Sequence, residues 1–128
     1  MEKISSLLIF VAGLHSVGFA IFHIYFWKIF KWKTELLKMT IANRAIIQIF
    51  NVLGIFLFFF MAFLCFRYEN ELLTTPLGKV ILGFCAGFWL IRLITQFIFL
   101  RVNHKIVHTL SVLFFIGFLL FLLPILLN

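Results

Sequence analysis

Residues 45–66 read AIIQIFNVLGIFLFFFMAFLCF, a stretch without a single charged side chain. At 1.5 Å per residue, a helix of this length crosses the hydrocarbon core of a bilayer, which is about 30 Å thick. A water-soluble domain of 128 residues must cover much of its surface with polar side chains. A chain built from stretches of this kind has too few polar side chains to do so. The stretch therefore predicts a membrane-spanning helix.

The rest of the chain has the same character. Apolar residues make up 65% of it and charged residues 12%, against about 45–50% and about 25% in ordinary globular proteins. Three further apolar stretches have a similar length, and the predicted spans are residues 4–27, 45–66, 77–100 and 105–127. We therefore predict an all-α fold in a single transmembrane domain, residues 1–128, that forms a polytopic bundle of four transmembrane helices.

A basic segment separates the first span from the second. Residues 28–39 read KIFKWKTELLKM, in which lysines alternate with large apolar side chains. Lysine ammonium groups favour the lipid head groups, and the ring of Trp32 favours the same depth. We predict a basic interfacial segment here, partly helical. Further along, Thr75-Pro76 predicts the start of the third helix, with Thr75 as the N-cap and Pro76 at the first helical position.

Lysines and arginines are distributed unequally between the two sides of the predicted bundle. One side holds Lys28, Lys31, Lys33, Lys38, Arg44, Arg101 and Lys105, and the other holds Lys3, Arg67 and Lys79. The positive-inside rule places the first side in the cytoplasm, so both termini are expected on the outer face. This predicts a multi-pass membrane protein, in the cell inner membrane if the source is bacterial. The net charge of +7 then reflects topology and contact with anionic lipids, and no nucleic-acid partner is expected.

Each predicted span carries polar side chains, although polar groups inside hydrocarbon are costly. Three sets have the spacing of one helix face, and the first span adds two histidines. These residues are Arg44, Gln48 and Asn51; Trp89, Arg92 and Gln96; His104, His108 and Ser111; and His15 and His23. Nearly all of them fall in the cytoplasmic half, which predicts one polar cavity that opens toward the cytoplasm. The alternative is that they only bond neighbouring helices together, at about 0.6 kcal/mol per bond, or reach the head groups at the membrane boundary.

Arg92 is the most informative of these residues. It is expected about 12 Å inside the inner membrane boundary, where an unpaired charge costs about 2.5 kcal/mol or more. None of the acidic residues can pair with it inside the membrane, because all of them fall at the terminus or in loops: Glu2, Glu35, Glu69 and Glu71. We therefore expect a guest molecule or water to neutralise Arg92, and the predicted guest is an anionic amphiphile, a lipid or an isoprenoid-like molecule. The predicted binding site comprises Arg92, Gln96, Gln48, Asn51, Arg44, His23 and His108.

The histidines allow two other functions. A small membrane enzyme acting on a lipid-like substrate would use His23, His104 and His108 as candidate catalytic acids or bases, but the sequence supplies no intramembrane carboxylate to work with them. A metal- or haem-binding redox component would draw on His104 and His108, spaced i, i+4, with His15 or His23 as a further ligand. The sequence names no cofactor.

The function that we expect first is binding of the amphiphile, or service as an accessory subunit of a membrane complex. Membrane lipids are the expected partners, and the phenylalanine-rich helix faces also suit a homo-oligomer or a larger complex. Cys65 and Cys85 are the only cysteines, and both fall in the outer halves of their spans. Two separate thiols and a disulfide are both compatible with that placement.

Overall fold

The structure is a computed structural model that describes residues 2–128. This part of the chain consists of helices and short connections, without a strand. Its elements are α1 (Glu2–Ile24), α2 (Phe26–Ile29), α3 (Trp32–Glu35), η1 (Leu36–Lys38), α4 (Ile41–Arg67), α5 (Glu69–Thr74), α6 (Pro76–Phe99) and α7 (Lys105–Leu127). Four of these described helices, α1, α4, α6 and α7, are long and apolar enough to cross a membrane. The prediction of an all-α membrane bundle of four helices is confirmed.

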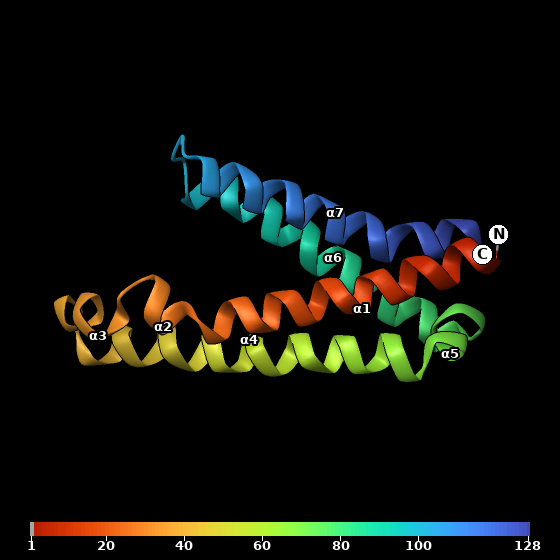
Figure 1. Cartoon of the computed structure of the whole chain (residues 1–128), viewed down its shortest axis with the longest axis horizontal. Coiled ribbons are helices and arrows are strands. Elements are labelled where there is room, and N and C mark those ends of the chain that lie inside the picture. Colours follow the sequence, from red (N-terminus) through yellow and green to blue (C-terminus); the bar gives the residue numbers. More distant parts are fainter. Residues whose placement is uncertain (1) are drawn as a thin grey trace.

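The four long helices form two antiparallel pairs (Figure 1). α1 packs along α4 and α6 packs along α7, while α1 also contacts α7 and so joins the two pairs. The pairs lie together at the end of the molecule that carries both termini and α5. They diverge toward the other end, which carries α2, α3 and the α6–α7 turn. We call these the converged end and the splayed end.

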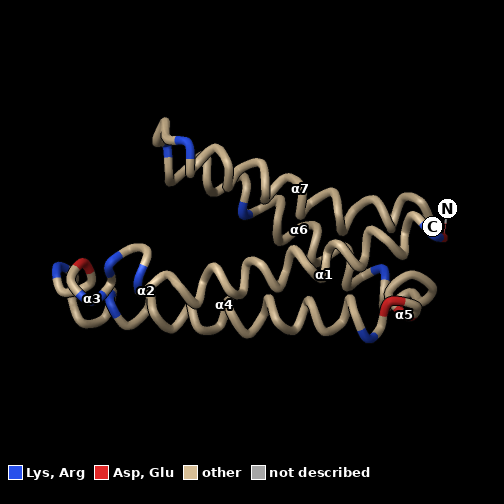
Figure 2. The backbone as a smooth tube through the Cα atoms, viewed as in Figure 1, with Lys and Arg blue, Asp and Glu red and all other residues tan. Residues whose placement is uncertain are grey.

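Lysine and arginine gather at the splayed end, where Figure 2 shows them along α2, α3 and the α6–α7 turn. The acidic residues Glu69 and Glu71 lie on α5 at the converged end. The positive-inside rule assigns the more basic end of a bundle to the cytoplasm. An orientation with the splayed end inside and both termini outside therefore stays our prediction.

Two helix boundaries differ from those expected from hydropathy. α1 ends at Ile24 rather than near 27, and the chain turns at Tyr25 before α2 begins. α4 begins at Ile41 rather than near 45, because the Thr40 hydroxyl accepts a hydrogen bond from the Asn43 amide at 3.3 Å and caps the helix. Hydropathy marks only the apolar part of a helix, whereas backbone hydrogen bonding continues past it.

The predicted start of the third span is confirmed. Thr75 is the N-cap of α6, its hydroxyl accepts a hydrogen bond from the Gly78 amide at 2.9 Å, and Pro76 is the first helical residue. Gly78 also lets α5 fold back closely onto α6. A Cβ at this position would overlap the Glu71 carbonyl oxygen and lie 2.5 Å from the Leu72 Cα. The α5–α6 turn therefore requires a residue without a side chain.

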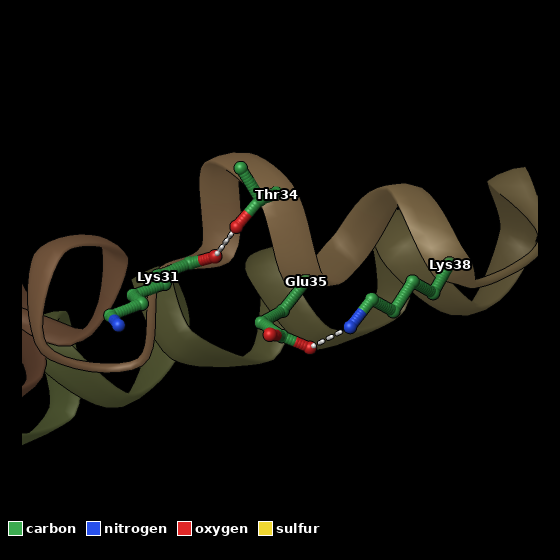
Figure 3. A network of polar contacts seen from close by, with 4 residues as sticks. All are labelled: Lys31, Thr34, Glu35 and Lys38. Atoms are coloured by element: carbon green, nitrogen blue, oxygen red, sulfur yellow. Dashed lines mark hydrogen bonds and ion pairs between the residues drawn. The ribbon is translucent and has the colours of Figure 1, made fainter.

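The basic segment between α1 and α4 forms short helical pieces, which confirms its predicted partial helicity. α2 and α3 are separated by Lys31, whose φ of 52° lies in the left-handed region. The Thr34 hydroxyl donates to the Lys31 carbonyl at 3.1 Å, and the Lys38 ammonium pairs with the Glu35 carboxylate at 3.1 Å (Figure 3). All four of these residues are exposed, whereas Leu36 is buried. The segment therefore keeps its charges outward around one apolar anchor.

The core of the bundle is aromatic and centres on Trp89 of α6, which is 1% exposed. Its ring stacks on Phe58 of α4, with centroids 5.5 Å apart, and on Phe114 of α7, with centroids 5.7 Å apart. The ring of Phe19 of α1 also packs against this indole, with centroids 4.8 Å apart. All four long helices therefore meet at one indole ring, and this contact sets their relative positions.

The converged end holds the two chain termini together. The Asn128 amide donates to the Ser5 hydroxyl at 2.7 Å, which joins the end of α7 to the start of α1. Cys65 of α4 and Cys85 of α6 are buried as free thiols. Of the two alternatives left by the sequence, the structure therefore has the separate thiols.

Candidate functional site

A cavity of about 490 Å³ lies between the two helix pairs. Its walls come from all four long helices and are mainly aromatic and aliphatic, with His23 and Arg92 as the side chains able to carry charge. The apolar lining includes Phe19, Phe50, Leu57, Phe88 and Phe114. Ligand sites typically have volumes of about 300–1,000 Å³ and apolar walls with a few polar groups that orient the ligand. The cavity has this character.

Arg92 reaches the cavity from α6. Its Nη1 donates to the Gln96 Oε1 at 3.2 Å, and its guanidinium carbon lies 4.4 Å from the centroid of the Phe114 ring. This cation–π contact stabilises the charge by about 1–2 kcal/mol. No carboxylate pairs with Arg92, since the one ion pair among residues 2–128 joins Lys38 to Glu35. Most of the five N–H donors of the guanidinium therefore stay available to another molecule.

Gln96 holds Arg92 in place and joins α6 to α7. Its side chain is 1% exposed. While its oxygen accepts from Arg92, its Nε2 donates to the Val107 carbonyl at 3.2 Å and lies 3.5 Å from the Ser111 hydroxyl. The amide is thus engaged by the protein on both sides. Gln96 supports the site from behind and does not line the cavity.

His23 enters the cavity from α1, within the other helix pair. Asn51 of α4, which is 6% exposed, donates from its Nδ2 to the His23 carbonyl at 2.9 Å. The Asn51 Oδ1 lies 2.8 Å from the His23 Nδ1. Within the described residues, the hydrogen bond of the His23 ring is made at Nδ1, and Nε2 makes none. Asn51 therefore fixes the imidazole through Nδ1, on a residue that lines the cavity.

Gln48 and Arg44 lie outside the cavity. The Gln48 Oε1 accepts from the Trp27 indole nitrogen at 3.0 Å, and its Nε2 donates to the Arg44 carbonyl at 3.1 Å. Gln48 therefore ties α2 to α4. Arg44 is half-buried in the first turn of α4, close to the predicted membrane boundary. The structure does not bring these two residues of the predicted site to Arg92.

His104 lies at the exposed α6–α7 turn, and His108 is an exposed residue at the start of α7. The His104 Nδ1 accepts a hydrogen bond from the Ile106 amide at 3.1 Å and so caps α7. The His108 Nε2 lies 2.8 Å from the Asn103 Oδ1. Both rings thus have local structural contacts at the surface. They are not placed in the cavity with His23, the third catalytic candidate.

His15 lies inside the bundle, well away from that turn. Its Nε2 donates to the Leu113 carbonyl at 2.9 Å, and its ring meets Trp89 edge-on with centroids 4.8 Å apart. In the part of the chain that the structure covers, no group of three or more His, Cys, Asp or Glu residues is placed to hold a metal ion. The ligand set considered from the sequence, His104 and His108 with His15 or His23, is therefore not assembled.

The site residues that sequence reasoning missed are the aromatic walls. Phe50, Phe88 and Phe114 line the cavity, but they belong to a set of 20 phenylalanines spread along the chain. Nothing in their spacing separates walls from lipid-facing side chains. One signal was present, because Trp89 shares a helix face with Arg92 and does line the cavity.

Comparisons with known proteins add no constraint to this geometry. No family model, curated protein or solved structure matches the chain. Its function is therefore argued from the cavity and from the residues around it.

Proposed function

We propose that the protein binds an anionic amphiphile, a lipid or an isoprenoid-like molecule, in the cavity between the two helix pairs. Arg92 carries this proposal. Its guanidinium belongs to a membrane-spanning helix, has no carboxylate partner in the described chain, and lines a cavity of about 490 Å³. A charge in this setting requires a counter-charge, and an anionic ligand supplies one.

The energetics favour a phosphate or carboxylate group at Arg92. An unpaired charge in a membrane-spanning helix costs about 2.5 kcal/mol or more. The Phe114 contact and the Gln96 hydrogen bond offset part of this cost, and they use only one N–H group. Charge-assisted, bidentate bonds to an anion are the strongest contacts open to the remaining donors. Ligand binding therefore neutralises a group that the protein leaves unpaired.

The walls of the cavity suit the apolar part of the same ligand. Phe19, Phe50 and Phe88 present aromatic surface from three different helices. The helix pairs also diverge at the splayed end (Figure 1). An amphiphile from the leaflet at that end would place its head group at Arg92 and its tail against the aromatic walls. In the predicted orientation, this is the cytoplasmic leaflet.

The alternatives draw less support from the geometry. An enzyme using His23 as acid or base would need a second titratable group of contrasting acidity nearby, and the described cavity wall adds only Arg92. Haem ligation by two histidines would need a second histidine facing His23. His15 instead bonds to the Leu113 carbonyl. We therefore propose a binding function.

Native mass spectrometry of the protein released from its own membrane tests the proposal. Arg92→Gln keeps hydrogen-bonding capacity and removes the charge. Lys79→Gln is the matched control, since Lys79 is an exposed lysine near the start of the same helix. We expect an anionic lipid adduct on the wild type and on Lys79→Gln, with occupancy at least about tenfold lower on Arg92→Gln. Equal adducts on all three proteins would overturn the proposal.

A further inference from the structure

The contacts of His23 define which hydrogen bonds a ligand can make to it. The Asn51 Nδ2 donates to the His23 carbonyl at 2.9 Å, so the other Asn51 atom, Oδ1, is the one that faces the ring at 2.8 Å. An amide oxygen only accepts, and therefore the His23 Nδ1 carries the proton. In the neutral ring, Nε2 is then an acceptor. Asn51 thus selects the tautomer whose Nε2 keeps a free lone pair, on a residue that lines the cavity.

The two polar residues of the cavity therefore place two different demands on the hydrogen-bonding groups of a ligand head group. Arg92 offers donors and a positive charge, which require anionic oxygens. The His23 Nε2 requires a donor. The phosphate of a phosphodiester meets only the first demand, since it has acceptor oxygens alone, and such a lipid would need a donor elsewhere in its head group to meet the second. The phosphate itself would set a charged oxygen against the imidazole lone pair.

We infer that the head group recognised here is a phosphomonoester, an anion that still carries an exchangeable proton; this rests on the proposed function. The second proton of a phosphomonoester dissociates at about pH 6, so the P–OH form is populated near neutrality. The P–OH donates to the His23 Nε2, while the charged oxygens face Arg92. Transfer of that proton to Nε2 leaves a dianion facing an imidazolium and a guanidinium. The complex is stabilised in both forms.

Two lipids that differ by one methyl ester on the phosphate, which removes this proton, provide the test. Dioleoyl phosphatidic acid is a phosphomonoester, and dioleoyl phosphatidylmethanol is the corresponding diester with one added methyl group. Native mass spectrometry of the full chain in detergent, with both lipids at equal concentration, measures the ratio of the two adducts. We expect about a tenfold preference for phosphatidic acid, the effect of one hydrogen bond to a charged group. Equal adducts would overturn the inference.

Variants then assign the preference to His23. His23→Phe keeps an aromatic ring against Phe26 and Phe58, whose centroids lie 4.1 Å and 5.1 Å from that of His23. It should bind both lipids at a ratio near one. His108→Phe, at an exposed position near the start of α7, should keep the wild-type ratio. An unchanged ratio in His23→Phe, or the same loss in His108→Phe, would count against the assignment. If His23→Phe fails to fold, the wild-type competition decides alone.

Free phosphate shares the chemistry of the head group and is tested separately. Inorganic phosphate at the same concentration should leave the phosphatidic acid adduct in place, because the aromatic walls contact the lipid chains. Displacement of the lipid would overturn the assignment to an amphiphile. Failure of the proposed function looks different: neither lipid would bind, or Arg92→Gln would bind both as the wild type does.

Discussion

The contacts around Trp89 lead to a quantitative prediction for Gly117→Ala. A Cβ added at Gly117 of α7 would lie 2.7 Å from the His15 Cε1 and 2.9 Å from the Trp89 Cγ. Contacts this short are not tolerated, so a neighbour has to move. The His15 ring has some freedom, but the Trp89 ring lies between Phe58 and Phe114 and moves only if they move. The substitution therefore disturbs the point where the four described spans meet.

The size of the effect follows from two opposing terms. Overpacking a well-packed core costs about 1–3 kcal/mol. Alanine is more favourable than glycine inside a helix by about 0.5–1 kcal/mol. The net destabilisation expected for Gly117→Ala is therefore about 0–2.5 kcal/mol relative to the wild type, and about 1–3 kcal/mol relative to an alanine substitution that gains only the favourable term. Gly83→Ala on α6 is the matched control, because an added Cβ there has no atom within 4 Å and only the favourable term remains.

The assay is equilibrium unfolding in detergent micelles, followed by circular dichroism. Gly117→Ala should unfold at a lower denaturant concentration than the wild type, and Gly83→Ala at an equal or higher one. A Gly117→Ala protein as stable as Gly83→Ala would refute the packing described around Trp89.

Three further predictions concern the α5–α6 turn, the α6–α7 hairpin and the topology. Gly78→Ala should destabilise the fold by about 3 kcal/mol, because the new Cβ meets the backbone of Leu72; wild-type stability in the same unfolding assay would contradict this turn geometry. Gln96→Leu removes the bonds to the Val107 carbonyl and to Arg92, together with the contact to Ser111, and should cost about 1–2 kcal/mol, and no loss in that assay would mean that these bonds are not formed. In intact cells, an impermeant thiol reagent should label Asn70→Cys and leave Thr34→Cys unlabelled; the reverse pattern would invert the orientation.

The all-α class and the four long apolar helices could be predicted because length and hydropathy are enough to identify a span. The start of α6 was also predictable, since Thr75 and Pro76 have local roles that need no tertiary contact. The sequence also predicted that Arg92 has no acidic partner inside the membrane. Every acidic residue falls outside the apolar spans, and the structure pairs none of them with Arg92 in the part it describes.

The rotation of each helix could not be predicted. Lipid-facing and core-facing side chains are both apolar in a membrane, so periodicity gives little contrast between them. His108 and Ser111 have the spacing of one helix face, yet Ser111 lies against Gln96 while His108 is exposed. Helix spacing places two residues on one face, but it does not say what that face meets.

Helix spacing alone also fails to separate Gln48 from Asn51 on α4. Gln48 and Asn51 also share a helix face, but their partners belong to different elements. Gln48 accepts from Trp27 of α2, and Asn51 bonds to His23 of α1. These partners follow from the end of α1 at Ile24 and the turn after it, which hydropathy did not locate. Only Asn51 is therefore coupled to the cavity.

An experimental structure of the protein purified with its native lipids tests the central claim most directly. We predict density for an anionic head group between the Arg92 guanidinium and the His23 imidazole, with apolar density along the aromatic walls. An Arg92 side chain that extends to the head-group layer, with lipid density only on the outside of the bundle, would contradict the claim.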